Sequence, residues 1–335
     1  MALESFLTDA LSPTLSREVE DFLDSQDTSH PFQFPQWADP GTRVVLHREE
    51  GKIRWAGTFG VHSPFGRKLP WIRAAVANRG PVCDDHRIWA EATEELSQTF
   101  AAEKISFIDV SPYWIQPAEN ESPKFANDAQ WERLKTQRSS LRLDLTANED
   151  EIFANFRKNS RYEVRRAERL GVTVSAASSD EEIDQFWRMY HALAARKNFL
   201  EDASERMQRQ IRWLINSESR GALLLARTGN VVRGGAVIGR AGRRCWYLWG
   251  ATDAEHEMNV GHIIQWNALR WAKSHGCTEY DFGGYTPGAT SGPAWFKAGF
   301  GGRVVHFVAP MRRVLRPGRY WIFSSLSKTM RQSER

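Results

Sequence analysis

The sequence Tyr280-Asp-Phe-Gly-Gly-Tyr285, followed by Trp295-Phe-Lys-Ala-Gly-Phe-Gly-Gly302, is the stretch of this chain that says most about its fold. The first segment completes a run typical of a β-strand, Cys277–Phe282, and the bridge between the two is rich in Thr, Pro and Gly, which predicts turns. So many glycines are typical of a backbone that bends sharply or approaches another group closely. Lys297 is the one cation of the stretch, and aromatic residues flank it. A strand that carries Asp281 near its end and leads into glycine-rich loops around a single lysine indicates a candidate site for chemistry.

The bulk composition is that of an ordinary globular protein. A length of 335 residues exceeds the usual size of one domain, so two domains are expected. The three cysteines, Cys83, Cys245 and Cys277, match neither a disulfide framework nor a metal-ligand spacing, which predicts a reducing compartment and no bound metal. The acidic N-terminus lacks the features of a secretory signal, and no run of 18 apolar residues occurs. The sequence therefore predicts a cytoplasmic protein without a transmembrane segment.

The two halves of the chain show the same order of predicted elements. In the first half, strands at 42–47 and 53–62 form a hairpin, and a helix at 86–103 and a strand at 105–110 follow. In the second half, a hairpin at 222–238 and a strand at 244–250 precede a helix at 260–274 and a strand at 278–282. Corresponding features lie roughly 175 positions apart. This pattern predicts an α/β fold made of two copies of one unit.

A predicted helix at 149–170 carries a stripe of cations. It begins with a capping box at Thr146–Glu149, and Phe153, Phe156 and Val164 share its apolar face. A second helix begins with a capping box at Ser178–Glu181 and extends to about Lys197. The other side of the first helix presents a row of cations at i, i+4 spacing, with a lysine beside it: Arg157, Lys158, Arg161, Arg165 and Arg169. Such a stripe is either a solvated helix face or a surface that binds a polyanion such as tRNA, and the sequence favours neither.

Five segments together resemble one known family. They are residues 156–172, the spacing Phe186-x3-Tyr190-x5-Arg196-x2-Phe199, Trp246–Thr252, Tyr280–Gly284 and Phe296–Gly302. In this order they resemble the signature of the Fem family, the non-ribosomal peptidyltransferases FemA, FemB and FemX that build peptidoglycan cross-bridges. The resemblance spans about residues 30–310. The segment between 178 and 216 holds two helices of ordinary length, as in FemX-type members without a coiled-coil arm.

The resemblance implies an architecture and an activity. It implies two tandem GNAT-like domains with mixed central sheets flanked by helices: residues 1–143, with about 313–335 packing back on them, and residues 144–312, which carry the acyl-transfer site. The implied enzyme is an acyltransferase that moves an aminoacyl group from aminoacyl-tRNA to an amine acceptor, such as a peptidoglycan precursor peptide. No cofactor is implied besides the donor itself, and peripheral contact with a membrane surface is a further expectation.

The resemblance also assigns candidate catalytic residues. Lys297 matches the lysine that the family places at the acyl-transfer centre, where a fixed ammonium stabilises the oxyanion formed when an amine attacks an ester. Asp281 either orients the amine or Lys297, or accepts N–H bonds from the glycine loop, as an acid at the end of a strand commonly does. The sequence offers no Ser or Cys nucleophile with a triad, which favours direct attack by the acceptor amine.

Further residues are candidates for substrate binding. Tyr190 and Arg196 match family positions near the acidic groups of the acceptor, although packing at a helix end is the alternative. Tyr247 and Trp249 flank Leu248, so they are expected to share one strand face, as core or as pocket lining. Three candidates lie in the first half of the chain: Gln33, Trp37 and Asp109.

Two rival functions stay open. A GNAT-like N-acyltransferase of exopolysaccharide, cellulose or natural-product biosynthesis would use acyl-CoA as its donor, and a loop that begins a helix would bind the CoA pyrophosphate. The corresponding segment here, Met258–Ile263, keeps only the glycine, Gly261. The other rival is a non-catalytic protein that binds a polyanion with the same fold.

Overall fold

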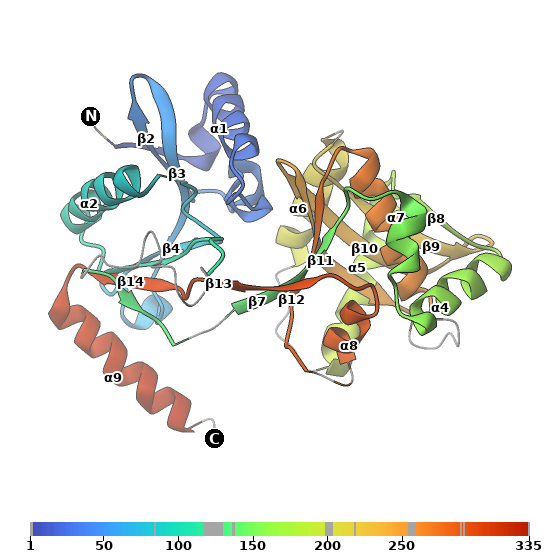
Figure 1. Ribbon diagram of the computed structural model, residues 1–335. Coiled ribbons are helices and arrows are strands. Elements are labelled where there is room, and N and C mark those ends of the chain that lie inside the picture. The colour runs from blue at the N-terminus through green and yellow to red at the C-terminus, as the bar shows by residue number, and fades with distance from the viewer. Residues whose placement is uncertain are drawn as a thin grey trace. The chain divides into compact units, whose positions relative to one another are not determined.

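The computed structural model describes residues 3–83, 85–116, 130–135, 138–197, 204–217, 219–253, 259–288, 290 and 292–333 (Figure 1). The chain divides into two compact units, Met1–Gln137 with Phe307–Arg335 and Arg138–His306. The expected boundaries, 143/144 and 312/313, each lie six residues further along the chain. The reason is that the strand Arg138–Asp144 pairs within the second unit, whereas the strand Met311–Val314 pairs within the first.

The first unit is built on one seven-stranded sheet in the order β1-β2-β3-β4-β5-β14-β6. Neighbours are antiparallel except for β4 and β5, which are parallel. The strands are β1 (Glu4–Leu7), β2 (Arg43–Glu49), β3 (Lys52–His62), β4 (Ala74–Asn78), β5 (Phe107–Ser111), β6 (Glu132–Arg133) and β14 (Met311–Val314). The helices are α1 (Pro13–Ser25), α2 (His86–Ala102) and α9 (Pro317–Ser333).

The second unit has a sheet of the same design, in the order β13-β7-β12-β11-β10-β9-β8. Its strands are β7 (Arg138–Asp144), β8 (Val172–Ala176), β9 (Gly221–Thr228), β10 (Val231–Ala241), β11 (Arg244–Thr252), β12 (Glu279–Gly284) and β13 (Arg303–Phe307). Its helices are α3 (Glu149–Ala154), α4 (Lys158–Arg169), α5 (Asp180–Lys197), α6 (Ser204–Asn216), α7 (Gly261–Ser274) and α8 (Gly292–Ala298).

The expected duplication is confirmed by the strand orders. Strands β1 to β5 occupy the places in the first sheet that β8 to β12 occupy in the second, and the parallel pair falls at the same place in both. The next place in each sheet is taken by a strand from outside this run: β14, near the C-terminus, beside β5, and β7 beside β12. In each sheet this strand is thus remote in sequence from the strand of the run that it pairs with.

Helices cover both faces of the second sheet. The adjacent glycines Gly234 and Gly235 of β10 show this directly, because a Cβ at Gly234 would meet Val260 at the start of α7, and one at Gly235 would meet Phe186 of α5. Neighbouring residues of a strand face opposite sides. The core on the α7 side contains three large aromatic side chains. They are Phe156, which lies between α3 and α4, Phe282 of β12, and Phe300, which follows α8.

The predicted helix at 149–170 is wrong as a single element, because α3 ends at Ala154 and α4 begins at Lys158. The N–H of Arg157 donates to the carbonyl oxygen of Gly299 (2.8 Å) instead of continuing a helix. The capping boxes also shift. Asn148 and Glu151 form the box of α3, and before α5 the backbone N–H of Glu182 donates to the Ser179 hydroxyl while its carboxylate accepts from the N–H of Ser178.

Within the residues that the structure describes, no helix is long and apolar enough to cross a membrane.

Candidate active site

The candidate site lies in the second unit, where two parallel strands separate. Strands β11 and β12 pair only over Arg244–Trp246 and Glu279–Asp281. Their counterparts β4 and β5 stay paired over the whole of Ala74–Asn78. Past the last pair, Gly283 adopts the left-handed conformation (φ 71°), and a Cβ there would lie 3.3 Å from the carbonyl oxygen of Tyr247. The separated strand ends leave their backbone groups available to other partners.

Lys297 occupies this position. It lies at the end of α8 rather than in a loop, which corrects the expectation of an irregular bridge up to Trp295. Its Nζ donates to the carbonyl oxygen of Gly284 (2.7 Å) and lies 5.9 Å from the centre of the Tyr247 ring. Burial lowers the pKa of Lys297 to about 8, and the charge of Asp281 opposes this shift. The amine is therefore mostly an ammonium at neutral pH and loses its proton more easily than an exposed lysine.

The aromatic residues and glycines around Lys297 fix α8 in place. The Phe296 ring packs against His262 (4.9 Å), and the buried Phe300 ring contacts Phe156 (5.1 Å) and Phe282 (5.4 Å). Position 299 has no room for a side chain, because a Cβ would lie 3.0 Å from the carbonyl oxygen of Phe296 and closer still to the Ser160 hydroxyl. The Phe-Lys-Ala-Gly-Phe segment thus locks the lysine-bearing helix onto α4 and α7.

Asp281 is fully buried in a polar network under the site. Its carboxylate accepts from Arg142 Nε (2.9 Å), from the backbone N–H of Gly283 (2.8 Å) and from the Ser140 hydroxyl. The bond from Gly283 is the expected interaction with the glycine loop. A direct role of Asp281 in catalysis stays a prediction.

Sequence analysis missed Ser140 and Arg142, the partners of Asp281. Both belong to β7, which pairs with β12 across a β-bulge between Asp281 and Gly284. No local pattern relates β7 to β12, since the paired residues Arg142 and Asp281 are 139 positions apart. A buried arginine beside a buried aspartate could be found only once the pairing of the two strands was known.

The expectation that Tyr247 and Trp249 share a strand face is wrong. The register between β10 and β11 shifts there, so that Tyr247 pairs with Ile238 and Trp249 pairs with the adjacent Val237. Adjacent residues of β10 face opposite sides, and the same therefore holds for their partners. Tyr247 packs beside the core on the α7 side, and a Cβ at Gly250 would collide with its hydroxyl. Burial, and to a smaller extent Tyr190, raises the pKa of Tyr247 to about 12.

No described contact places Tyr190 or Arg196 beside Lys297. Tyr190 is half-buried on α5, its ring 6.2 Å from Phe186. Arg196 is exposed in the last turn of α5, next to residues 198–203, which lie outside the described part of the chain, as does Phe199 of the family spacing. Met258 of the expected CoA segment also lies outside it. The binding roles of Tyr190 and Arg196 stay predictions.

The three candidates of the first unit take part in the packing of that unit. The Gln33 side chain is buried, accepts from the N–H of Thr58 (2.9 Å) and donates to the carbonyl oxygen of Asn78 (2.6 Å). Trp37 is buried with its ring stacked on Phe32 (5.0 Å). Asp109 forms an ion pair with Arg312 (2.5 Å). These contacts stabilise the first unit, and a binding role for the three residues remains a prediction.

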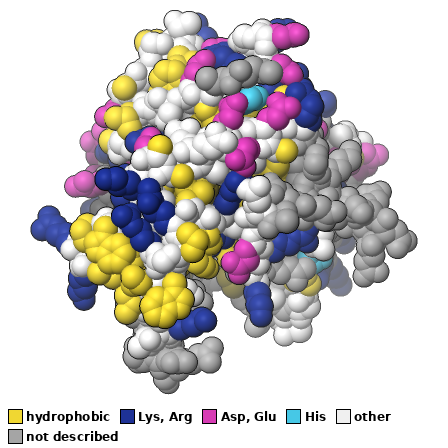
Figure 2. Space-filling model, turned by 90° about the vertical axis from the view of Figure 1, so that its left-hand side faces the viewer, with side chains coloured by type: hydrophobic (Ala, Val, Ile, Leu, Met, Phe, Trp, Pro, Cys, Tyr) yellow, Lys and Arg dark blue, Asp and Glu magenta, His cyan; other side chains and the backbone are white. Residues whose placement is uncertain are grey.

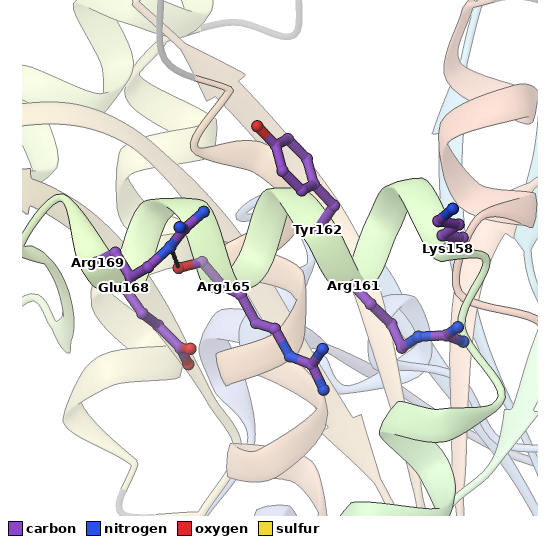
Figure 3. A pocket seen from close by; sticks show the side chains of 6 residues that line it. All are labelled: Lys158, Arg161, Tyr162, Arg165, Glu168 and Arg169. Atoms are coloured by element: carbon purple, nitrogen blue, oxygen red, sulfur yellow. Dashed lines mark hydrogen bonds between the residues drawn. The ribbon is translucent and has the colours of Figure 1, made fainter.

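Four cations of the stripe, together with Tyr162 and the acidic Glu168, line a hollow of ≈ 690 Å³ on α4: Lys158, Arg161, Arg165 and Arg169 (Figure 3). Arg161 and Arg165 point to one side of the helix and Tyr162 to the other. Arg161 donates to the carbonyl oxygen of Ala154 (2.7 Å) and to that of Phe156, so it satisfies the end of α3. The guanidinium of Arg157 lies 4.2 Å from the centre of the exposed Trp295 ring, two residues before Lys297. The basic surface therefore continues from α4 to the helix that carries the candidate lysine.

Comparison with known proteins shows which fold the chain has. The family described as the acetyltransferase (GNAT) domain matches residues 154–297. The crystal structure of FemX resembles the whole chain, with a TM-score of 0.80 at 17% identity over 95% of this chain and 99% of that one. A tandem GNAT protein from the clavulanic acid biosynthesis pathway has a TM-score of 0.53 at 12% identity, over 93% of this chain and 98% of that one. The fold is therefore that of two tandem GNAT-like units.

Curated relatives extend the comparison to sequence. A UDP-N-acetylmuramoylpentapeptide-lysine N(6)-alanyltransferase of Weissella viridescens is 24% identical over 149 residues, which are 44% of each chain. A lipid II:glycine glycyltransferase of Staphylococcus haemolyticus is 29% identical over 89 residues, 26% of this chain and 20% of that one. The matches thus span less than half the length of these relatives. The resemblance of this chain to the Fem family is confirmed in both sequence and fold.

Proposed function

We propose that this chain is a Fem-type acyltransferase that moves an aminoacyl group from aminoacyl-tRNA to an amine on an acceptor such as a peptidoglycan precursor peptide. The observation that carries the proposal is the half-buried Lys297 ammonium at the point where β11 and β12 separate, 5.9 Å from the Tyr247 ring. The names of the two relatives support the proposed kind of acceptor. One is an alanyltransferase that acts on the lysine of UDP-N-acetylmuramoylpentapeptide, and the other is a lipid II:glycine glycyltransferase.

The proposed reaction is direct aminolysis of an ester. The acceptor nitrogen forms a bond to the ester carbon, the bond from that carbon to the ribose oxygen breaks, and the proton lost by the amine ends on the leaving oxygen. Negative charge develops on the carbonyl oxygen in the transition state, and an ammonium already fixed beside it lowers the barrier. The hydrogen bond from Lys297 Nζ to the carbonyl oxygen of Gly284 holds the ammonium in place without neutralising it.

Packing at the start of α7 favours tRNA over CoA as the donor. In an acyl-CoA enzyme of this class the N-terminal N–H groups of the corresponding helix meet the pyrophosphate. Here the Phe296 ring lies 3.4 Å from the position of a Cβ at Gly261 and packs against the buried His262. Burial lowers the pKa of His262 to about 4, so this side chain is neutral and supplies no charge for an anion. An apolar, uncharged first turn is a poor site for a diphosphate.

The donor can be tested directly. The purified protein is incubated with aminoacyl-tRNA or with acetyl-CoA, each with a peptidoglycan precursor peptide, and transfer to the amine is measured by mass spectrometry. We expect transfer from tRNA and none from acetyl-CoA. Transfer from acetyl-CoA alone would establish the acyl-CoA alternative, which the match to an acetyltransferase domain supports.

Reversing the charge of the stripe should weaken tRNA binding. The test is the triple substitution Arg157→Glu, Lys158→Glu and Arg165→Glu; Arg161 is kept because it satisfies backbone carbonyls. Each lost phosphate contact weakens binding and flattens its dependence on salt, so we expect at least about a tenfold rise in Kd. The measurement is a titration of labelled tRNA at two salt concentrations.

A control for this titration carries the same change of charge elsewhere. Arg17, Lys52 and Lys104 are exposed residues of the first unit. Their combined substitution by Glu should leave the Kd within about twofold of the parent value, because they do not belong to the α4 surface and salt screens exposed charges that do not contact the tRNA. Equal weakening by the two triple variants would contradict a specific role of the α4 surface.

The lowered pKa of Lys297 predicts a pH dependence. If the ammonium is the active form, kcat/KM should fall as the pH rises through about 8, where Lys297 loses its proton. An arginine side chain at this position would keep its charge in this range, so the Lys297→Arg variant should lose this fall while keeping part of the activity. A pH profile in which both proteins fall alike at alkaline pH would exclude Lys297 as the titrating group.

A further inference from the structure

Helix α9 packs on the first unit with one side only. Tyr320 and Phe323 face inward, where their rings lie 5.6 Å and 4.7 Å from that of Phe107 in β5. Phe65, at the start of the segment 65–71, lies 5.9 Å from Phe323 on the same side. These contacts hold α9 and the segment 65–71 together as one piece of surface.

Arg319 joins the two parts further. Its guanidinium lies 5.9 Å from the centre of the Trp71 ring and donates to the carbonyl oxygens of Trp71 (2.9 Å) and Lys104 (3.2 Å). Because this arginine is used to hold the segment against α9, the position of Trp71 is fixed by the fold.

This piece of surface exposes three large apolar side chains. Trp321 is 70% exposed, Trp71 is 40% exposed and Leu326 is 39% exposed. Trp321 lies about 100° around the helix from Tyr320 and about 160° from Phe323, the two residues that face inward, so it points away from the core. Exposed apolar side chains that gather in one region usually mark an interaction surface.

Cations accompany these apolar side chains. Arg67, Lys68 and Lys328 are exposed, and no acidic residue occurs between Met311 and Ser333. Figure 2 shows hydrophobic side chains and Lys or Arg side chains next to one another on the lower part of the face it presents, at the level of α9. The α9 surface consists of six exposed residues: Arg67, Lys68, Trp71, Trp321, Leu326 and Lys328.

We propose that the α9 surface docks onto an anionic phospholipid membrane. Tryptophan side chains favour the interface between lipid and water, and cations next to them are attracted to anionic headgroups. The charge of the surface complements such a partner, because no acidic residue occurs in α9 or in the segment 65–71 to neutralise its cations. A nucleic acid would also satisfy the cations and stacks on exposed aromatic rings, so it is one outcome of the test below. Two exposed tryptophans beside cations, with no acidic residue in α9, favour an anionic lipid interface.

The proposal does not rest on acyl transfer, since none of these residues belongs to the candidate active site. It does have a consequence for the proposed function: docking would hold the enzyme at a surface on which lipid-linked acceptors are found. Binding and transfer are measured separately, so failure of one leaves the other intact.

The test is co-sedimentation of the full chain with vesicles. One set is made of phosphatidylcholine alone and the other contains about 30 mol % phosphatidylglycerol. We expect binding to the anionic vesicles, loss of binding at high salt, and at least about a tenfold weaker affinity for the double variant Trp71→Ser and Trp321→Ser. The variant Trp321→Phe should keep most of the binding, and Val231→Ser, which removes an exposed apolar side chain of the second unit, should change nothing.

Three results would overturn the proposal. The first is equal binding, or none, to both kinds of vesicle. The second is unchanged vesicle binding by a double variant whose circular dichroism matches that of the parent protein. The third is binding of an RNA oligonucleotide that Arg67→Glu and Lys68→Glu abolish while vesicle binding persists, which would make the α9 surface a nucleic-acid surface.

Discussion

Replacing Lys297 with Met should lower kcat/KM for aminoacyl transfer by about 100-fold or more while leaving the protein folded. Removal of one fixed donor to a developing oxyanion costs about 10²–10³ in rate. Methionine keeps most of the length and the apolar contacts of the side chain and removes the ammonium, together with its hydrogen bond to the carbonyl oxygen of Gly284. Donor binding should change little, because the interaction is made with the transition state. The measurement is the initial rate of transfer at several donor concentrations.

A measurement of stability distinguishes a catalytic role of Lys297 from a structural one. The folded state must keep a half-buried ammonium, as the lowering of the Lys297 pKa to about 8 shows. A lysine whose pKa is lowered by folding reduces stability, and this cost is complete below the folded pKa of about 8 and shrinks as the pH rises from there to the ordinary value of 10.5. Lys297→Met should therefore be at least as stable as the parent protein at pH 7, as judged by its melting temperature. A loss of activity that follows a loss of stability would point to packing instead.

Lys52 provides the matched control. It is an exposed lysine at the hairpin between β2 and β3, and its replacement by Met removes the same charge from a position in the other unit. Lys52→Met should retain full activity. If Lys297→Met retained activity within about tenfold of the parent, a barrier change of only ~1.4 kcal/mol, a central catalytic role for Lys297 would be excluded.

Much of the fold could be predicted because it depends on local patterns. The hairpin turns near Gly51 and Gly229 and the amphipathic helices α2 and α7 follow from periodicity and turn residues within a few positions of each other. The duplication follows from these patterns, since it needs only the same order of elements twice. The aromatic residues around Lys297 likewise indicated a candidate site from sequence alone.

The features that could not be predicted depend on contacts between distant segments. The break between α3 and α4 is fixed by the Gly299 carbonyl oxygen, which accepts from Arg157, and by Arg161, which bonds the end of α3. The shifted faces of Tyr247 and Trp249 result from a register change against β10. A sequence shows neither, because helix periodicity and strand alternation continue through both points.

In the residues that the structure describes, the two units differ at the point that forms the candidate active site of the second. In the first unit β4 and β5 pair along their whole length and Asp109 is neutralised by Arg312, so the strand ends are closed. In the second unit β11 and β12 separate after Trp246, and Gly283 and Gly284 turn the backbone so that a carbonyl oxygen accepts from Lys297. The two units thus share one topology, but the central parallel strands stay paired in the first unit and separate in the second.

Replacing Asp281 with Asn should destabilise the protein by about 3–5 kcal/mol, the second large effect that the structure predicts. Arg142 and Asp281 form an ion pair at 2.9 Å in which both side chains are buried, 2% and 0% exposed. Removing one partner of a buried pair leaves an uncompensated charge in the core, which is strongly unfavourable. Glu279, 3.6 Å from Arg142, offsets part of the loss, so the lower end of the range is expected. The measurement is chemical denaturation at neutral pH.

Two further variants decide whether this loss of stability comes from the uncompensated charge of Arg142. In the double variant Arg142→Met and Asp281→Leu no charge is left in the pair, so part of the stability should return. The exposed ion pair of Glu149 and Arg270 is the control, and Glu149→Gln should cost at most about 1 kcal/mol. If Asp281→Asn cost no more than Glu149→Gln, the network under the glycine loop would not be what holds β7 against β12. If instead the double variant were as unstable as the single one, the uncompensated charge of Arg142 would not account for the loss.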